Sequence, residues 1–413
     1  MEIEDHLFRR EAGRMIAVLT RVFGVHNLAL AEDVVQDAFC RALEVWKLRG
    51  APDNPSAWLM ATAKRRAIDV LRRERTARTF APELGRLLDS EWTLVPVVDE
   101  LFCPPEVDDG LLRMMFSCCH PKLAEEAQLA LVLNILCGFS VPEIAAAFLS
   151  SPAAIQKRLV RGKRVLAAAR RLFDLTDADF AMRLSVVQRA LYLLFNEGYH
   201  GASAESAVRS ELCLEALRLT SILAGHRLSG TPSTLALNAL MSFNAARLPA
   251  RVDPSGNLTS LADQDRSRWD AALVVQGRQL LTRSANGQSI SEYHVEAAIA
   301  SIHTNAASAE TTDWEQIVAL YGALMNLRPS PVVALNRAIA LGRFQGPEQG
   351  LRAISEIDDV ERLASYPFYF AALGEMELQL GRREVARTHF EDARQLARSE
   401  MERRFFQERV RAC

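Results

Sequence analysis

Apolar residues recur at helical spacing through most of the chain. Residues 31–46, AEDVVQDAFCRALEVW, place apolar side chains at steps of four, three and four residues, which lie on one face of an α-helix. Residues 54–73, NPSAWLMATAKRRAIDVLRR, carry a second stripe, with Asn54 as a candidate N-cap and Pro55 at the first helical position. Few alternating β-branched runs are present, so the pattern predicts an all-α protein. The predicted stripes are Val35, Phe39, Ala42 and Trp46 in the first helix and Met60, Ala63, Ala67 and Leu71 in the second.

The helical pattern is interrupted between residues 79 and 109. This stretch contains four prolines, and its eight carboxylates stand against one arginine, Arg86. Proline-rich, aperiodic and acidic sequence is typical of a connecting segment rather than of a packed helix. We therefore expect an acidic linker here.

A helix-turn-helix is predicted from two helix-start signals within residues 140–171. Ser140 and Glu143 have the spacing of a capping box, so a short helix should begin near Val141. Ser151 followed by Pro152 indicates another helix start only about ten residues later. Two short helices joined by a tight turn form this motif.

The second of these helices is strongly basic. Residues 150–171 hold seven basic side chains and no acidic one, although the whole chain has a net charge of only −2. At 100° per residue, one face is apolar and the opposite face is a row of cations behind a small residue, which suits a DNA major groove. A solvated basic helix is the alternative. The predicted core face is Ile155, Leu159, Gly162 and Leu166, and the predicted reading face is Ala153, Lys157, Arg161, Arg164, Ala168 and Arg171.

A second basic segment spans residues 64–78, where seven basic residues outnumber Asp69 and Glu74. Trp58 lies about one and a half helical turns upstream. Rings stack on unpaired bases while cations follow the backbone, so this combination favours a surface that separates DNA strands. Trp58 is equally compatible with a place in the helical core.

The order of these segments resembles the bacterial extracytoplasmic-function (ECF) sigma factors, over roughly residues 5–172. The resemblance implies that residues 1–78 form sigma region two, which binds core RNA polymerase and recognises the minus-ten element. Residues 79–107 are then the acidic linker, and residues 108–173 are region four, whose helix-turn-helix recognises the minus-thirty-five element. Residues 174–413 form an additional regulatory extension.

The same resemblance implies a role for individual residues. Region two would dock on the clamp helices of the polymerase β′ subunit, and region four would also touch the β flap. Family members often have Asn where this chain has Arg65. The implied polymerase-binding residues are Asp33, Gln36, Asp37 and Phe39; the minus-ten residues are Trp58, Lys64, Arg65, Arg66, Asp69, Arg72 and Arg73; and the minus-thirty-five residues are Ala153, Gln156, Lys157, Arg158, Arg161 and Arg164.

The extension contains signals typical of tetratricopeptide repeats (TPR), in which helix pairs stack into a concave surface. Ala338 and Gly346 precede the corresponding Leu373 and Gly381 by thirty-five residues. ECF factors with such an extension are thought to use it for regulation, and their genes commonly neighbour those of small DGPF/YCII-like proteins, which are candidate partners. The sequence leaves open whether the extension inhibits or activates. The remaining TPR-like positions are Trp314, Tyr321, Gly374, Ala386, Phe390 and Ala393.

Other candidate sites give weaker signals. Adjacent cysteines in the Cys118–His120 stretch are poorly spaced for tetrahedral zinc, so a core role is favoured. The polar clusters around Glu197 and around Asp263 could form a ligand pocket, although networks at helix ends are favoured. The loop at Asp253 lacks the bidentate glutamate of a calcium site. No nucleophile–base pair or phosphate-binding loop is evident, so we expect no enzyme and no cofactor or metal.

Composition and targeting signals favour a cytoplasmic protein. Charged residues make up 24% of the chain, and no apolar run approaches the roughly 18 residues of a membrane span. The charged N-terminus does not resemble a secretion signal. The seven scattered cysteines suit free thiols in a reducing compartment.

Two other functions fit parts of the sequence. A helix-turn-helix regulator with a TPR sensor would bind duplex DNA alone and would not need the AEDVVQDAF docking helix. A TPR scaffold would use its basic helices to bind acidic proteins. Transcription dependent on core polymerase distinguishes a sigma factor from both.

Overall fold

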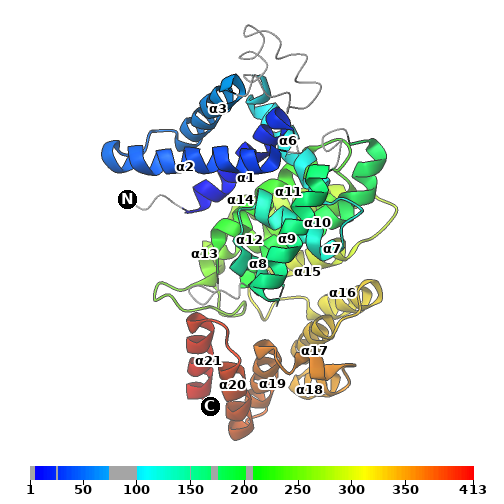
Figure 1. Cartoon of the computed structure of the whole chain (residues 1–413). Helices are drawn as coiled ribbons and strands as arrows, with labels where there is room; N and C mark the ends of the chain where they lie inside the picture. Colours follow the sequence, from blue (N-terminus) through cyan, green and yellow to red (C-terminus); the bar gives the residue numbers. More distant parts are fainter. Residues whose placement is uncertain (1–4, 25–26, 74–99, 149, 169–174, 201–207) are drawn as a thin grey trace. The chain divides into compact units, whose positions relative to one another are not determined.

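The computed structural model describes residues 5–24, 27–73, 100–148, 150–168, 175–200 and 208–413. Its regular elements are helices, and the described residues contain only one isolated β-bridge, between Val252 and Leu258. The predicted all-α class is therefore confirmed. No described helix combines the length and the hydropathy needed to cross a membrane. The chain forms two compact units, residues 1–193 with 226–229 and residues 194–225 with 230–413 (Figure 1).

The N-terminal unit is built from helices that surround α1. Helix α1 packs against α2, α3 and α6, and also against the π-helical turn η3. At this last contact Gly13 lies directly against the backbone carbonyl of Leu136, so the two elements approach more closely than any side chain would allow. The elements are α1 (Asp5–Phe23), α2 (Leu28–Arg49), α3 (Pro55–Arg73), α6 (Pro104–Cys118), α7 (Glu125–Leu131), η3 (Val132–Leu136), α8 (Val141–Ala147), α9 (Pro152–Ala168) and the first part of α10 (Asp177–His200).

The two predicted apolar stripes of α2 and α3 lie in the core of this unit. Trp46 is 2% exposed and its ring lies 5.4 Å from that of Trp58. Phe39 and Met60 are half-buried, while the other six stripe residues are buried. Leu59, which the stripe omitted, is fully buried as well. The helical spacing therefore predicted the inward faces well.

The acidic linker falls mainly on residues 74–99, which lie outside the described residues. Helix α6 begins at Pro104, within the segment predicted as linker. Proline is favoured in the first turn of a helix because the N–H that it lacks has no partner there. Pro104 and Pro105 thus start a helix, although they had counted as signs of irregular structure.

The start of α10 belongs to the N-terminal unit rather than to the extension predicted from residue 174. The ring of Phe180 lies 4.4 Å from that of Phe116 in α6, and Arg183 donates a hydrogen bond to the Phe116 carbonyl. Phe180 is 2% exposed. Residues 177–193 therefore complete the core beneath α6.

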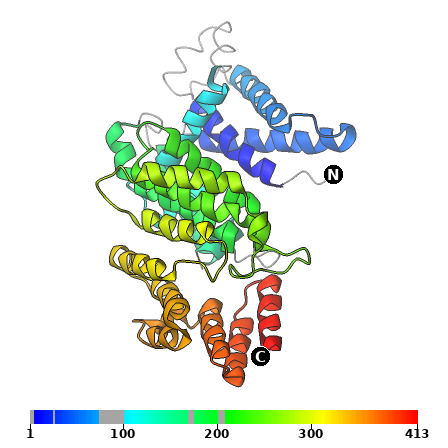
Figure 2. The same cartoon turned by 180° about the vertical axis from the view of Figure 1, so that it is seen from behind.

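The C-terminal unit centres on α12, which is buried on all sides, polar residues such as Asn238 and Ser242 included, and packs against α11, α14 and α15. After these helices come successive helix hairpins from α16 to α21, which Figure 2 shows in yellow to red. The elements are α11 (Ser210–Gly225), α12 (Pro232–Ala246), α13 (Leu248–Arg251), η4 (Arg266–Arg268), α14 (Ala271–Ser284), α15 (Glu292–Asn305), α16 (Trp314–Leu327), α17 (Pro331–Gln345), α18 (Pro347–Ser355), η5 (Val360–Leu363), α19 (Pro367–Gln379), α20 (Arg383–Gln395) and α21 (Glu400–Ala412).

Glycines allow the chain to reverse between the helices of two of these hairpins. Gly346 ends α17 with φ of 100°, and Gly381 follows α19 with φ of 75°. Residues with side chains rarely adopt such positive φ values. Gly374 also lies against the ring of Phe390, so this ring of α20 packs directly on the backbone of α19.

Candidate nucleic-acid interface

The helix-turn-helix begins with the predicted capping box. The backbone N–H and hydroxyl of Ser140 donate to a carboxylate oxygen of Glu143, at 2.8 and 2.7 Å, and the N–H of Glu143 donates to the Ser140 hydroxyl at 3.4 Å. Burial alone would raise the pKa of Glu143, but the hydrogen bonds from Ser140 and the Arg9 guanidinium lower it. Ser151 caps α9 by accepting from the N–H of Ala154. Both short helices therefore start where the sequence predicted.

Helix α9 presents two different faces. Its buried residues are Ile155, Leu159, Gly162 and Leu166, the four that were predicted. Gly162 lies against the Leu131 side chain of α7, which fixes α9 on the core. On the other side, Ala153, Gln156, Lys157, Arg161 and Arg164 are exposed and Arg158 is half-buried.

The exposed cations of α9 lack ion-pair partners within the described part of the chain. Lys157, Arg161 and Arg164 form no ion pair with any described residue. Lys163 differs, because its ammonium contacts the carboxylate of Glu32 in α2 at 2.5 Å. The remaining basic side chains thus form a solvated positive surface that could contact a polyanion without first breaking internal ion pairs.

The predicted polymerase-docking residues lie together on α2. Asp33, Gln36 and Asp37 are exposed. Phe39 is half-buried and packs edge-on against Phe8 of α1, with the ring centroids 4.7 Å apart. Three polar side chains are therefore available to a partner, while Phe39 mainly anchors the helix to its neighbour.

The predicted minus-ten residues lie on the neighbouring helix α3, whose N-terminus is capped by Asn54. Arg65 and Asp69 are exposed, and Lys64 is half-buried. Arg66 forms an ion pair with Asp37 of α2 at 2.9 Å, so the two predicted surfaces adjoin. The backbone of Arg72 and Arg73 continues α3, but their side chains lie outside the described residues.

Both interpretations of Trp58 find support. Its ring packs against the buried ring of Trp46 in an edge-to-face contact, as a core residue would. Its side chain also remains half-exposed at the start of α3. Trp58 is therefore fixed in place by one edge and accessible at another.

Sequence reasoning missed the ion pairs that join the N-terminal helices to the helix-turn-helix. Arg9 of α1 pairs with Glu143 of α8 at 2.8 Å, and Lys163 pairs with Glu32. The partners are separated by more than a hundred residues in the chain. No local pattern could have indicated them.

The weaker candidate sites form structural interactions. Burial raises the pKa of both Cys118 and Cys119, and no cluster of metal-ligating side chains occurs within the described residues. The Asp253 carboxylate accepts from the N–H groups of Ser255 and Asn257, which closes a tight turn. Glu197 pairs with Arg209 at 2.6 Å. Asp265 and Asp270 cap η4 and α14, as expected of networks at helix ends.

Three segments of the chain match known protein-family models. Residues 7–77 match the family model described as sigma-70 region 2, and residues 113–166 match that of sigma-70 region 4. Residues 183–285 match a family of unknown function, DUF6596. The first two matches contain the surfaces on α2, α3 and α9.

Two relatives extend this comparison to whole proteins. An uncharacterized protein of Rhizobium meliloti is 38% identical over 385 residues, which cover 92% of this chain and 89% of the relative. The RNA polymerase sigma factor CarQ of Myxococcus xanthus is 32% identical over 161 residues, or 38% of this chain and 83% of CarQ. With both conserved sigma regions present, the chain belongs to the sigma-70 family of RNA polymerase sigma factors.

Proposed function

We propose that this protein is an ECF-type sigma factor that binds core RNA polymerase in the cytoplasm and directs it to specific promoters. The observation that carries this function is the exposed cation row of α9, which lies opposite a fully buried core face. The alternative, a basic helix that is only solvated, does not account for the position of α9 as the second helix of a capped helix-turn-helix. Core polymerase and promoter DNA are the partners that the sigma family implies.

Each surface would make a distinct contribution to initiation. Asp33, Gln36 and Asp37 of α2 would bind the β′ clamp helices. Helix α3 would hold the separated minus-ten strand through its cations and Trp58. Helix α9 would bind the minus-thirty-five duplex, where contacts to phosphates supply affinity and contacts to base edges supply specificity. The polymerase itself would perform the catalysis.

The helices from α16 to α21 would form a TPR-like regulatory region. Support comes from the repeated arrangement of α17–α18 and α19–α20, in which both first helices begin with proline, at Pro331 and Pro367. Both also end at a glycine with positive φ, Gly346 or Gly381, and these glycines are thirty-five residues apart. Repeated hairpins of this length are the building unit of TPR arrays.

Run-off transcription with purified core polymerase tests the sigma function on the chain's own promoters. We expect initiation at those promoters only when both the full-length protein and the core enzyme are present. Replacing Asp33 and Gln36 by Ala should weaken binding to core polymerase by roughly tenfold, because exposed polar contacts would be lost. Cys40→Ser, an exposed change on the same helix, serves as the control.

The alternative, a helix-turn-helix regulator that acts without replacing sigma, gives a different result. Such a protein would bind promoter duplex with the same affinity whether or not core polymerase is present. It would also change transcription only when another sigma factor is supplied. Either finding on genuine target promoters would show that the protein acts as such a regulator and not as a sigma factor.

A further inference from the structure

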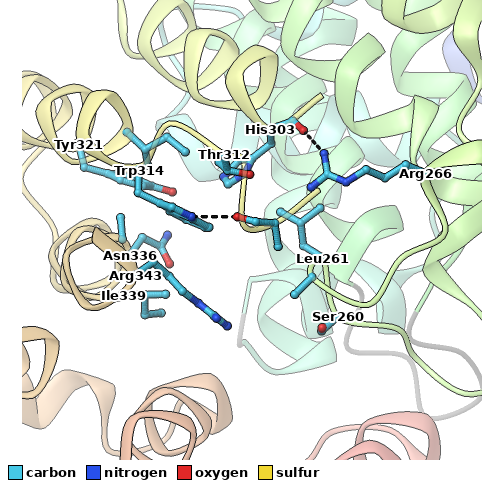
Figure 3. Close-up of a pocket in the computed structure, with 14 residues that line it drawn as sticks. Ser260, Leu261, Arg266, His303, Thr312, Trp314, Tyr321, Asn336, Ile339 and Arg343 are labelled. Atoms are coloured by element: carbon cyan, nitrogen blue, oxygen red, sulfur yellow. Dashed lines mark hydrogen bonds between the residues drawn. The ribbon is translucent and has the colours of Figure 1, made fainter. Parts of the chain in front are cut away.

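The C-terminal unit contains a cavity large enough to hold a small molecule. The cavity has a volume of about 570 Å³ and is lined by the end of α10, α13, the loop at residues 258–263 and helices α17, α19 and α21. A second cavity of about 240 Å³ adjoins it and shares Asn336, Ile339 and Arg343 of α17. Figure 3 shows this smaller cavity, with Arg343 extending from α17 on the side of Ser260. The larger volume lies within the range of small-molecule sites.

Part of the larger cavity is apolar and aromatic. Tyr366, Phe368 and Phe405 line it, and each of them is half-buried. Phe368 also packs edge-on against the buried ring of Phe406, with centroids 5.8 Å apart, so its orientation is fixed. These rings offer a preformed surface for the apolar body of a ligand.

Three arginines are among the residues that line the two cavities. Arg251 and Arg343 line the larger cavity, and Arg266 lines the smaller one. None of the three forms an ion pair with a described residue. Arg251 donates to the Tyr199 carbonyl and lies over its ring, 4.6 Å from the centroid, while its buried Nε has no hydrogen-bond partner in the described structure. Arg266 donates to two backbone carbonyls at 2.6 Å.

The charge around this end is positive beyond the lining residues. Arg247, only 8% exposed, also lacks an ion pair with the described part of the chain. Loss of hydration lowers the pKa of the His200 imidazole, and three neighbouring arginines lower it further. His200 also lines the cavity, and its imidazole nitrogens can take part in hydrogen bonds. Partial burial of a cation without a counterion is unfavourable, so an anionic ligand beside the half-buried Arg251 would offset part of this cost.

Two of the acidic lining residues are held by a third arginine of the cavity. Asp263 and Glu375 both pair with Arg409, at 3.1 and 3.7 Å, so the charge of this arginine is more than balanced. Glu310 is exposed at the rim, and its pKa is lowered mainly by a hydrogen bond from Ser308 and less by the charge of Arg343. Arg409 therefore has two carboxylate partners, whereas Arg251 has none among the described residues and Arg343 has only the exposed Glu310 nearby.

We propose that the larger cavity binds a small organic anion whose carboxylate or phosphate group contacts Arg251 and Arg343 and whose apolar body lies on Phe368 and Phe405. Guanidinium groups suit both kinds of anion because they donate two parallel hydrogen bonds to oxygen pairs. This site does not depend on the sigma function, because its ligand is recognised entirely within the C-terminal unit.

Binding can be measured with 8-anilinonaphthalene-1-sulfonate, an aromatic anion that fluoresces in apolar surroundings, added to the full-length protein. We expect saturable binding at one site per chain. N-phenyl-1-naphthylamine, which has the same rings without the sulfonate, should bind at least about tenfold more weakly, because it lacks the charge that the arginines attract. Equal affinity for the two probes would overturn the site.

Arg343→Gln is the decisive variant, and Arg337→Gln is its matched control. Both arginines are exposed on α17, but only Arg343 lines the cavity. We expect Arg343→Gln to weaken binding of the sulfonate probe about tenfold and Arg337→Gln to leave it within about twofold of wild type. Circular dichroism checks that both variants are folded. The same affinity in both variants would contradict the assignment.

Competition experiments identify the anionic group and separate this site from the sigma function. Sodium benzoate and phenyl phosphate should displace the sulfonate probe, whereas neutral benzamide should not. The stronger of the two anions assigns the site to carboxylates or to phosphates, and displacement by benzamide as effective as by both would refute anion recognition. Because fluorescence is read without polymerase or DNA, failed transcription would leave this result unaffected.

Discussion

The arginines of α9 and two arginines of the C-terminal unit, Arg247 and Arg251, carry the same charge in different surroundings. On α9, Arg161 and Arg164 stand in water above a buried apolar face. In the C-terminal unit, Arg251 is half-buried against the Tyr199 ring and Arg247 is 8% exposed. Neither group has carboxylate partners among the described residues. The difference therefore lies in hydration rather than in charge.

This difference indicates which anion each group can recognise. Hydrated cations in a row bind a polyanion chiefly by releasing its counterions, so their binding should depend steeply on salt. Half-buried cations beside aromatic rings have already lost part of their hydration and are screened less, so they suit a single anion of defined shape. Binding of promoter DNA by the α9 cations should therefore depend more steeply on salt than binding of a small anion by the cavity.

The largest effect is expected from the triple change of Lys157, Arg161 and Arg164 to Ala. Loss of three phosphate contacts should weaken binding of the holoenzyme to promoter DNA by at least about a hundredfold. It should also lower the slope of log affinity against log salt by about three units. Fluorescence anisotropy between 50 and 200 mM salt measures both quantities.

A control of equal charge replaces Arg337, Arg352 and Arg383, three exposed arginines of the C-terminal unit, by Ala. This variant should retain the wild-type affinity for promoter DNA and the wild-type salt slope, because DNA binding should depend on the position of the cations and not on net charge alone. A wild-type slope in the α9 variant would assign the DNA contact elsewhere. A similar loss in the control would mean that the C-terminal unit also binds DNA.

The close packing of α1 against η3 in the N-terminal unit can be tested at Gly13. An added Cβ would meet the backbone carbonyl of Leu136, which cannot move aside as a side chain can. Gly13→Ala should therefore lower the free energy of unfolding of the N-terminal unit by about 2 kcal/mol or more, despite the better helix propensity of Ala. Urea denaturation measures the change.

Gly110→Ala in α6 is the matched control, because nothing lies within 4 Å of its added Cβ. Here only the helix propensity changes, so unfolding should cost about 0.5–1 kcal/mol more than in wild type. If both substitutions stabilised the protein equally, the close approach of α1 and η3 would be wrong.

Lys163 tests whether every cation of α9 belongs to the hydrated row. Its ion pair with Glu32 is about one-third exposed at both partners, so its contribution to stability should be below about 1 kcal/mol. Lys163→Met should therefore lower stability slightly and leave the salt slope for promoter binding unchanged. A fall of about one unit, as expected for Arg161→Ala, would place Lys163 on the DNA instead.

The smallest effect concerns pH at Glu143. Because the pKa of this carboxyl is lower in the folded protein than its ordinary value of about 4.3, its charged form stabilises the fold above that value. Wild type should exceed Glu143→Gln in unfolding free energy by about 1 kcal/mol or less near pH 6, since the group is partly exposed. The difference should vanish as pH falls through the folded-state pKa, and a constant difference at all pH values would exclude this linkage.

The sequence by itself determined the local features of the reading helix. Helical spacing assigned Ile155 and Leu159 to the core and Arg161 to the surface, because a helix of regular pitch fixes the angle between any two of its residues. The Ser140–Glu143 cap was predictable for the same reason, since its two hydrogen bonds close within one turn. The assignment of the stripe on α3 also depended on neighbouring positions only.

Only the tertiary structure decided which distant residues meet. Arg251 and Arg343 come from α13 and α17, and no periodicity relates them, yet they line one cavity with the rings of α19 and α21. The pairs Arg9–Glu143 and Lys163–Glu32 arise in the same way. Local sequence sets the faces of each helix, but the packing of those faces sets which distant side chains line one cavity and how much water each of them loses.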